Sequence, residues 1–484
     1  MKEYSIKLRD ELKFGLRNDV RSGKNKAELS FLRGLRPDSS GLVANLRSER
    51  ILDELGDINF PFPQVFKFNR TTIVATLDAL YYYDDIGEVL TPIVCYSVDD
   101  TDVEEEIVGN GLWHFADMHD SWMLTNGENA VFLVPFSKFV ANGVDKVLLT
   151  RNIVNTCCYY KGRLITGGFC EDDVYPVFNP LKPGDYRYSA IGGGDCFTDF
   201  VPSLRYNIYR EDTKRNDSGF ATALGRGNVV CVKKLGEYLV VYSTESVVAY
   251  QMVLAPDSVL GGKIIELENG PVNRSAVGGD ENEHIYLDKN RCLWRLDGNL
   301  KLKRHGYEEF FEAFDECADI SILLSPTDSK DQGRNYYISD GYRSFLLSNN
   351  GLSESSIIHT AISKFIQGKL YGTFSGVDST FELITDVIDI ELRAFKMLEF
   401  VEVGYSNITN LRSEVLASYD NGVTFKSFGL RLHNSEGFAN HHVSAPDFKI
   451  RLTGDINKNS VVSHLTMRWK LDDKRSIRSP YDAS

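Results

Sequence analysis

The sequence NVVCVKKLGEYLVVYSTESVVAY, residues 228–250, decides the fold class of this chain. Its β-branched and aromatic runs, at 229–232, 238–242 and 247–250, are separated by compact polar turns. The scheme repeats in HIYLDKNRCLWRLDG, residues 284–298, where two apolar runs flank a polar turn. Such runs are typical of antiparallel hairpins, so residues 228–298 predict two consecutive β-ribbon units.

The same unit recurs elsewhere in the chain. Hairpins are predicted at 121–134, 157–166 and 335–347, with turns at Asn126-Gly127, Lys161-Gly162 and Asp340-Gly341. Asn-Gly and Asp-Gly favour type I′ turns, because both central residues need a positive φ. The turn tips near residues 244, 289 and 340 lie roughly 45 to 50 residues apart, the spacing of propeller blades. We therefore predict an all-β chain with an irregular β-propeller over residues 51–380.

Two segments within 51–380 depart from the hairpin pattern. Residues 171–227 carry four prolines and the triplet Gly192-Gly193-Gly194, and they predict a loop insertion in the propeller. The triplet is not followed by the helix and Lys-Ser/Thr pair of a phosphate-binding loop. Residues 305–318 show a narrow apolar stripe at helical spacing and predict a helix.

The two ends of the chain differ from the propeller region. Residues 1–50 are rich in Lys and Arg and predict an extended basic arm. Two interpretations stay open: a solvated basic tail, or an arm that docks on a neighbouring molecule. The arginines that would serve in docking are Arg9, Arg17, Arg21, Arg33 and Arg36.

The C-terminal region predicts a separate domain. Within residues 381–472 we predict longer strands with regular alternation of apolar and polar residues, at 395–403, 415–419, 423–428, 448–452 and 462–471. Together they predict a β-sandwich. Residues 473–484 are polar and predict a frayed tail.

Composition limits the function classes. The formal net charge of −14 opposes general binding to duplex DNA, which needs a basic surface. No run approaches the roughly 18 apolar residues of a membrane span, and we expect a soluble protein made in the cytosol. The eight cysteines contain no C-x-x-C pair, so neither a disulfide framework nor a zinc ribbon is expected.

The sequence predicts no metal site and no cofactor. The acidic run 99–106 lacks the ligand spacing and central glycine of a calcium loop. His114 and His119 are five residues apart, which places them on opposite faces of a strand. Shared metal ligation by these two histidines is therefore not expected.

No catalytic residue is predicted either, and we expect no enzyme activity. A glycosidase needs two carboxylates near one bond, and nothing in the sequence brings the candidates Asp117, Asp120 and Glu283 together. The Gly-x-Ser-x-Gly motif of an esterase is absent.

The motif Ser418-x-Asp420-x-Gly422 matches the Asp-box turn of sialidase-like propellers. Its aspartate can accept backbone N–H groups and its glycine can supply a positive φ. The motif therefore predicts a structural hairpin turn.

Three places in the chain resemble the tail-hub proteins of short-tailed bacteriophages, also known as nozzle or packaged-DNA stabilisation proteins. These are the strand–turn–strand unit 235–247, the connection 262–280 into 283–287, and the C-terminal pieces 416–422 and 448–452. The basic arm and the 171–227 insertion depart from that family.

The resemblance implies a structural virion protein in the phage tail. Its members would form a ring, expected to be hexameric, that docks below the portal and adaptor and contacts other tail proteins. The ring would retain packaged DNA and form the channel for its ejection, without sequence-specific binding. Carboxylates lining the channel would keep DNA from adhering.

Two other functions stay open. One is a carbohydrate-binding or glycan-cleaving propeller of a phage tail tip, which would cluster aromatic and carboxylate residues at one propeller face. The other is a cellular propeller scaffold for protein partners.

Overall fold

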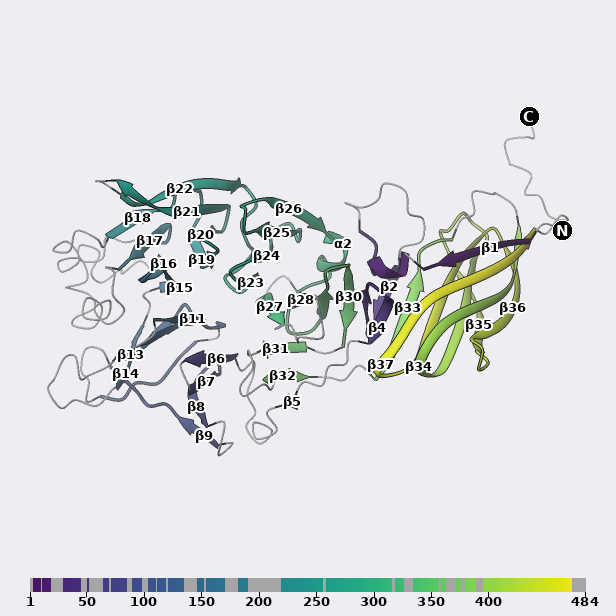
Figure 1. The fold of residues 1–484 in the computed structure, drawn as a ribbon, viewed down its shortest axis with the longest axis horizontal. Helices are drawn as coiled ribbons and strands as arrows, with labels where there is room; N and C mark the ends of the chain where they lie inside the picture. The colour runs from purple at the N-terminus through teal and green to yellow at the C-terminus, as the bar shows by residue number, and fades with distance from the viewer. Residues whose placement is uncertain are drawn as a thin grey trace. The chain divides into compact units, whose positions relative to one another are not determined.

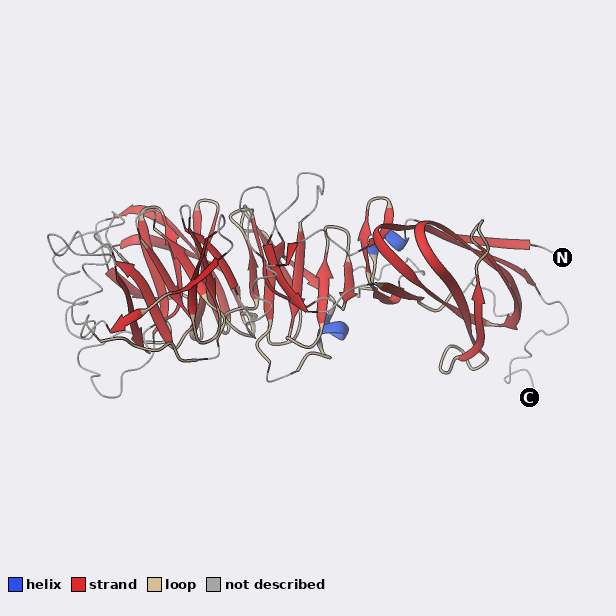
Figure 2. Cartoon of the chain, turned by 90° about the horizontal axis from the view of Figure 1, so that it is seen from below, coloured by secondary structure: helices blue, strands red, loops and turns tan. Residues whose placement is uncertain are grey.

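In the computed structural model, the described residues lie almost entirely in strands and turns, and among them two short helical segments occur, η1 (Glu11–Phe14) and α2 (Glu308–Phe311) (Figure 2). The residues that the structure describes are 3–9, 11–18, 29–44, 50–51, 64–68, 71–84, 89–97, 103–109, 111–118, 121–134, 146–151, 154–169, 182–189, 219–255, 258–315, 318–325, 334–356, 358–362, 371–375, 379–388 and 395–471. The chain divides into two compact units, each made of separate stretches of sequence. Unit 1 comprises residues 1–48, 327–358 and 375–484, and unit 2 comprises 49–326 and 359–374.

Unit 2 is a β-propeller of successive small sheets. The first two blades are β6 (Gln64–Phe68), β7 (Thr71–Ala75), β8 (Leu80–Asp84) and β9 (Val89–Pro92), then β11 (His114–Asp117), β12 (Trp122–Thr125), β13 (Asn129–Val134) and β14 (Lys146–Arg151), with β10 (Cys95–Ser97) beside β14. The next two are β15 (Val154–Tyr160), β16 (Arg163–Phe169), β17 (Asp185–Tyr188) and β18 (Gly219–Thr222), then β19 (Val229–Leu235), β20 (Tyr238–Ser243), β21 (Ser246–Ala255) and β22 (Ser258–Leu267). The following blade is β23 (Val277–Gly279), β24 (Glu283–Leu287), β25 (Leu293–Asp297) and β26 (Leu302–Gly306).

These blades are antiparallel meanders arranged around a common centre (Figure 1). Their first strands face that centre: β11 packs beside β15, β15 beside β19, and β23 beside β27 (Ser321–Ser325). A further small sheet joins β31 (Ile358–Ile362) and β32 (Tyr371–Ser375) to β5 (Arg50–Ile51), so strands distant in sequence share one sheet.

The core of unit 2 lies between neighbouring blades. One cluster joins Tyr160 and Ile165 of one blade to Val232 and Leu239 of the next. Because each sheet packs on both faces, its strands are apolar on both faces, as in VVCV and YLVVY. This explains why continuous apolar runs mark the blades in the sequence.

The predicted hairpins at 121–134, 157–166, 228–250, 284–298 and 335–347 are confirmed, but the turn chemistry is partly different. At Lys161-Gly162 both residues have positive φ, 47° and 82°, as a two-residue type I′ loop requires. At Asn126 and Asp340 the type I′ prediction is wrong, because only the following glycines have positive φ. These loops have four residues, and the side chains of Asn126 and Asp340 accept backbone N–H groups instead.

Two predictions within the propeller need correction. The span 171–227 is not wholly an insertion, because β17 and β18 lie in it and complete a blade. The predicted helix 305–318 is reduced to the single turn α2, which follows Tyr307 with φ 71° and no side-chain cap. The rings of Phe311 and Phe314 are buried there, so residues of the predicted apolar stripe pack in the core although no long helix forms.

Unit 1 is a large curled sheet in which two long strands are central. The strands β34 (Lys396–Ser418) and β37 (Asp447–Leu471) pair antiparallel along most of their length. Within unit 1 the strands of this sheet follow the order β28 (Asn335–Ser339), β29 (Ser344–Leu347), β30 (Leu352–Ser355), β2 (Leu29–Arg33), β33 (Thr380–Thr385), β37, β34 and β35 (Lys426–Leu432). β36 (Phe438–Ala445) pairs with the first half of β34.

The predicted sandwich arises from bending of this one sheet. Several register shifts interrupt the β34–β37 ladder between Leu398 and Arg412, and Asn407 and Asn410 have positive φ there. The ring of Phe448, near one end of β37, packs against that of Trp469 near the other end, with 5.3 Å between the ring centroids. The two halves of the long strands therefore face each other across a buried core. Where the sequence predicts separate strands at 395–403 and 415–419, and again at 448–452 and 462–471, the structure has one continuous strand each time.

The N-terminal residues are extended, and their described strands pair within the chain. β1 (Glu3–Leu8) lies along the end of β37, and β2 lies between β30 and β33 (Figure 1). The hairpin of β3 (Leu35–Asp38) and β4 (Gly41–Ala44) also reaches β37 through Val43 and Leu42. Residues 1–44 are thus part of unit 1 wherever the structure describes them.

Candidate functional site

The polar residues that join neighbouring blades form the best-defined cluster in unit 2; we call His114, Thr156, Lys233 and Arg274 the inter-blade cluster. Arg274 precedes β23, yet its guanidinium donates to carbonyls of two other blades. Its two terminal nitrogens donate to Asn155 O and Thr125 O, each at 3.1 Å. One side chain thereby ties three blades together.

The imidazole of His114 continues the cluster. Its Nδ1 lies 2.8 Å from Thr156 Oγ1, which also accepts the backbone N–H of Val232 at 3.0 Å. The nearby backbone of Arg274 works to raise the pKa of this ring, but it is the smallest of the influences on it. Strands β11, β15 and β19 are joined through one hydroxyl.

Lys233 completes the cluster from β19. Its ammonium donates to Val277 O on β23 at 2.8 Å. Burial lowers the pKa of Lys233, and burial also lowers the pKa of Arg274 to about 10. Burial, followed by the charges of Arg274 and Lys233, holds the pKa of His114 well below its usual value, so this ring is neutral.

The chemistry of this cluster is that of a structural clamp. Its cations are bonded to backbone carbonyls, and its histidine is neutral and hydrogen-bonded to Thr156. The neighbouring thiols are also unreactive: burial raises the pKa of Cys231 to about 11 and places that of Cys158 well above its usual value. No group of three metal-binding side chains occurs among the described residues.

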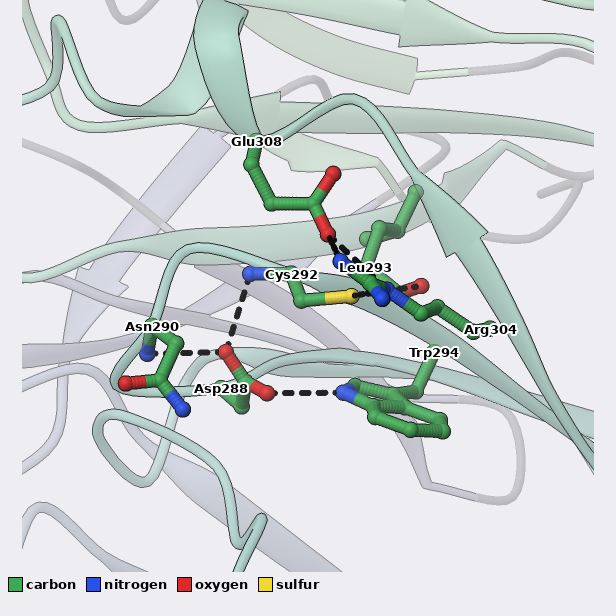
Figure 3. A network of polar contacts seen from close by, with 7 residues as sticks. All are labelled: Asp288, Asn290, Cys292, Leu293, Trp294, Arg304 and Glu308. Carbon is green, nitrogen blue, oxygen red and sulfur yellow. Dashed lines mark hydrogen bonds and ion pairs between the residues drawn. The ribbon is translucent and has the colours of Figure 1, made fainter. Parts of the chain in front are cut away.

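A second network closes the turn between β24 and β25 (Figure 3). Asp288 accepts the backbone N–H of Asn290 and Cys292 at 2.8 and 2.9 Å, and the indole N–H of Trp294 at 2.8 Å. One carboxylate therefore fixes both the loop and a large aromatic side chain.

The thiol of Cys292 in this network is also held protonated. Arg304 donates to Glu308 at 2.9 Å and approaches Cys292 Sγ at 3.1 Å (Figure 3). Burial, followed by a hydrogen bond with Glu308, raises the pKa of Cys292 to about 12. Burial works to raise the pKa of Glu308, but its bonds to Arg304 and Cys292 outweigh this and lower it. The network joins β26 to α2 and offers no nucleophile.

Unit 1 holds a buried chain of three polar side chains. Ser413 Oγ on β34 lies 2.8 Å from both His433 Nε2 and His441 Nε2. His433 Nδ1 lies 2.8 Å from Gly437 O, so Nδ1 carries the proton and Nε2 accepts from Ser413. His441 must then donate to Ser413. This chain connects β34, β36 and the loop between β35 and β36.

The residues of the predicted Asp-box turn lie at the tip between β34 and β35. Asp420 accepts from Ser418 Oγ at 2.7 Å and from the backbone and hydroxyl of Thr424 at 2.9 and 2.5 Å. Ser418 accepts the N–H of Gly422, whose φ is 79°. The hydrogen bonds from Thr424, then from Ser418, lower the pKa of Asp420 to about 2.

The candidate docking arginines have varied surroundings. Arg33 pairs with Glu354 at 2.9 Å, and Arg17 lies 3.6 Å from Asp386, so both charges meet carboxylates of unit 1. Arg9 follows β1 on the surface and Arg36 lies in β3. Arg21 lies outside the described residues. Docking of this segment on a neighbour stays a prediction.

The candidate carboxylates are on separate blades. Asp117 lies in β11, whereas Glu283 lies in β24, where it pairs with Arg295. Asp120 and His119 are outside the described residues. The residues that sequence reasoning missed are Arg274 and the Ser413–His433–His441 chain. Their partners are far away in sequence, so no local signal pointed to them.

Comparison with known proteins finds no matching family model and no matching curated protein. Several solved structures share the strand arrangement loosely. Apo AztD from Citrobacter koseri aligns with a TM-score of 0.34 at 9% identity, covering 81% of this chain and 90% of its own. Hsv2 from Kluyveromyces lactis gives 0.26 at 8% identity, covering 65% and 98%. A nutrient-binding protein from Bacteroides thetaiotaomicron gives 0.29 at 9% identity, covering 57% and 66%.

These similarities are too low to carry an argument about function. The propeller fold rests on the sheets of the chain itself. Within the described part of the chain, no helix has the length and apolar character needed to cross a bilayer.

Proposed function

We propose that this chain is a structural protein of the tail of a short-tailed bacteriophage, a hub or nozzle built as a homo-oligomeric ring. In this proposal it docks below the portal and adaptor, retains packaged DNA and lines the path of ejection. It catalyses no reaction and needs no cofactor. The sequence resemblance described above suggests the family, and the geometry supports a scaffold.

The observation that carries the proposal is that the polar side chains of the inter-blade cluster are bonded to neighbouring blades. A ligand site needs a few polar groups that are available to bond the ligand. Here Arg274, Lys233 and His114 are bonded to backbone carbonyls of neighbouring blades or to Thr156. Such bonds stiffen the propeller, as a conduit under the pressure of packaged DNA requires.

The net negative charge of the chain is consistent with a channel through which DNA passes. The formal net charge is −14, from 68 acidic and 54 basic side chains. Carboxylates repel phosphates over about 10 Å at ordinary salt, so an acidic lining lets DNA slide without adhering.

The test is the mass of the purified chain by light scattering, alone and with its candidate adaptor. A ring-sized assembly, formed alone or only on the adaptor, supports the proposal. A chain that stays monomeric with the adaptor and binds or cleaves glycans contradicts it and favours the carbohydrate-directed alternative. A monomer that binds neither adaptor nor glycans favours the cellular scaffold.

A further inference from the structure

The two cations of the inter-blade cluster are bonded to groups that bring no net negative charge. Lys233 donates to Val277 O. The terminal nitrogens of Arg274 donate to Asn155 O and Thr125 O. Among the described residues, no carboxylate oxygen lies within 4.0 Å of a side-chain nitrogen of either cation. A cation removed from bulk water is normally paired with an anion, because leaving it unpaired is costly.

The carboxylates of the surroundings act on these cations only from a distance. Burial outweighs the charges of Asp319 and Glu128 and lowers the pKa of Arg274 to about 10. Burial likewise outweighs the charge of Asp280 and lowers the pKa of Lys233. None of these three carboxylates forms an ion pair with either cation, so the positive charges are not neutralised by them.

The neighbouring thiols do not supply the missing negative charge. Burial raises the pKa of Cys231 to about 11 and that of Cys158 well above its usual value. Both thiols are therefore protonated at neutral pH. The compensating charge does not come from a described side chain of the cluster.

The two cations occupy one region of the propeller. After burial, the charges of Arg274 and then of Lys233 lower the pKa of His114, so both act on the same ring. Lys233 lies on β19 and Arg274 directly before β23, and these first strands of neighbouring blades face the centre (Figure 1).

Donors for an anion remain in this region. The Nε–H of Arg274 is buried and has no hydrogen-bond partner. Lys233 has further N–H groups besides the one that reaches Val277 O. A buried donor without an acceptor is rare in a folded protein, so the Arg274 Nε–H indicates a partner that the protein itself does not provide.

We propose that a small inorganic anion, of the size of chloride, binds beside Arg274 Nε and the Lys233 ammonium and neutralises the clamp. The ion accepts N–H groups from two neighbouring blades and adds to their cohesion. It stabilises the folded propeller and is not a substrate. This inference goes beyond the proposed function and does not depend on it.

The experiment measures thermal unfolding of the full chain in sodium chloride and in sodium gluconate at equal ionic strength. Gluconate is a bulky organic anion and serves as the reference. Lys233→Met removes one ligand of the ion. Lys234→Met is the matched control, because the ammonium of Lys234 pairs with the carboxylate of Glu281 at 2.8 Å. Wild-type crystals soaked in bromide and measured by anomalous scattering locate the ion without any variant.

An anion that binds only the folded chain raises the unfolding temperature by roughly 2–4 °C for each tenfold rise in its concentration above the dissociation constant. The wild type and Lys234→Met are expected to show this rise in chloride over gluconate, and Lys233→Met is expected to lose it. Bromide is expected beside Arg274 Nε and Lys233 Nζ.

A wild type without a chloride-specific rise overturns the inference, and so does an equal rise in Lys233→Met. A crystal without bromide at this place also overturns it. Bromide found there without any chloride-specific rise marks binding at crystal concentration only and counts against it. If Lys233→Met does not fold, the rise in the wild type and the bromide position decide between these outcomes.

Discussion

At the scale of single residues, Arg274 is the clearest case of a side chain that holds the propeller together. Replacing Arg274 with Gln removes the fork that reaches Asn155 O and Thr125 O. Leaving two carbonyls without their donors is expected to lower the free energy of unfolding by about 2–4 kcal/mol. Arg274→Lys is expected to restore little, since an ammonium cannot reproduce the planar fork. Urea unfolding measures both; a loss below about 0.5 kcal/mol would contradict the clamp.

The histidines of unit 1 predict sensitivity to acid. Burial first, and then the charges of His433, Arg431 and His442, lower the pKa of His441 from 6.5 to about 4. Below pH 6.5 His441 binds a proton in the unfolded chain, whereas in the folded chain it stays neutral until the pH approaches 4. Stability is therefore complete above pH 6.5 and is lost as pH falls towards 4.

Thermal unfolding between pH 7.5 and 4.5 checks this. His284 and His114 in unit 2 also have lowered pKa values and act in the same direction, so variants are needed to separate the units. His441→Gln keeps a donor for Ser413 and removes the titration. Its unfolding temperature is expected to fall less steeply with pH than that of the wild type. Equal slopes would refute the role of His441.

At the scale of elements, the hairpin turns are stabilised by side-chain oxygen atoms. Asp288 accepts three N–H groups, including an indole, and is buried. Asp297 accepts only the N–H groups of Asn299 and Lys301 at an exposed turn. Asp288→Ala is expected to lower the free energy of unfolding by about 2–4 kcal/mol and Asp297→Ala by about 1 kcal/mol. Chemical unfolding of the two variants side by side tests the order, and equal losses would contradict it.

Local signals in the sequence predict the blade hairpins well. The runs at 229–232, 238–242 and 284–287 match β19, β20 and β24 closely, because β-branched runs and polar turns act over a few residues. The short strands β17 and β18 were missed, since four-residue strands among prolines and glycines carry no clear period. The sequence does not predict the full lengths of β34 and β37. Polar residues such as Asn407 and Asn410 indicate a turn between two strands, whereas in the structure they lie where one long strand bends.

Long-range contacts set the limit of prediction. The partners of β1 and β2 are strands near the other end of the chain, and nothing in residues 1–44 indicates them. Arg274 shows the same limit within the propeller: its carbonyl partners lie 119 and 149 residues earlier. Side chains whose partners are fixed only by tertiary structure cannot be read from local patterns.

At the scale of the whole molecule, the N-terminal strands complete unit 1. A variant that starts at residue 49 lacks the strand between β30 and β33 and the strand beside the end of β37. The edges of β30, β33 and the end of β37 would be uncovered, and apolar residues such as Phe381 and Met467 would become exposed. This variant is expected to be aggregated or to lose the unfolding transition of unit 1. Adding a peptide of residues 1–48 is expected to restore part of the transition, and a truncated chain as stable as the full one would contradict this.

Unit 1 is built from separate stretches of the sequence, so its paired strands leave the ribosome at different times during translation. Ser30 bonds Thr385, 355 residues later, so β2 leaves the ribosome roughly 20–70 s before its partner β33 at bacterial speeds. β35 depends on β34, and β34 on β37, which ends at residue 471. A prematurely terminated chain that lacks β37 therefore cannot complete the sheet of unit 1, because both β34 and β33 pair with that strand.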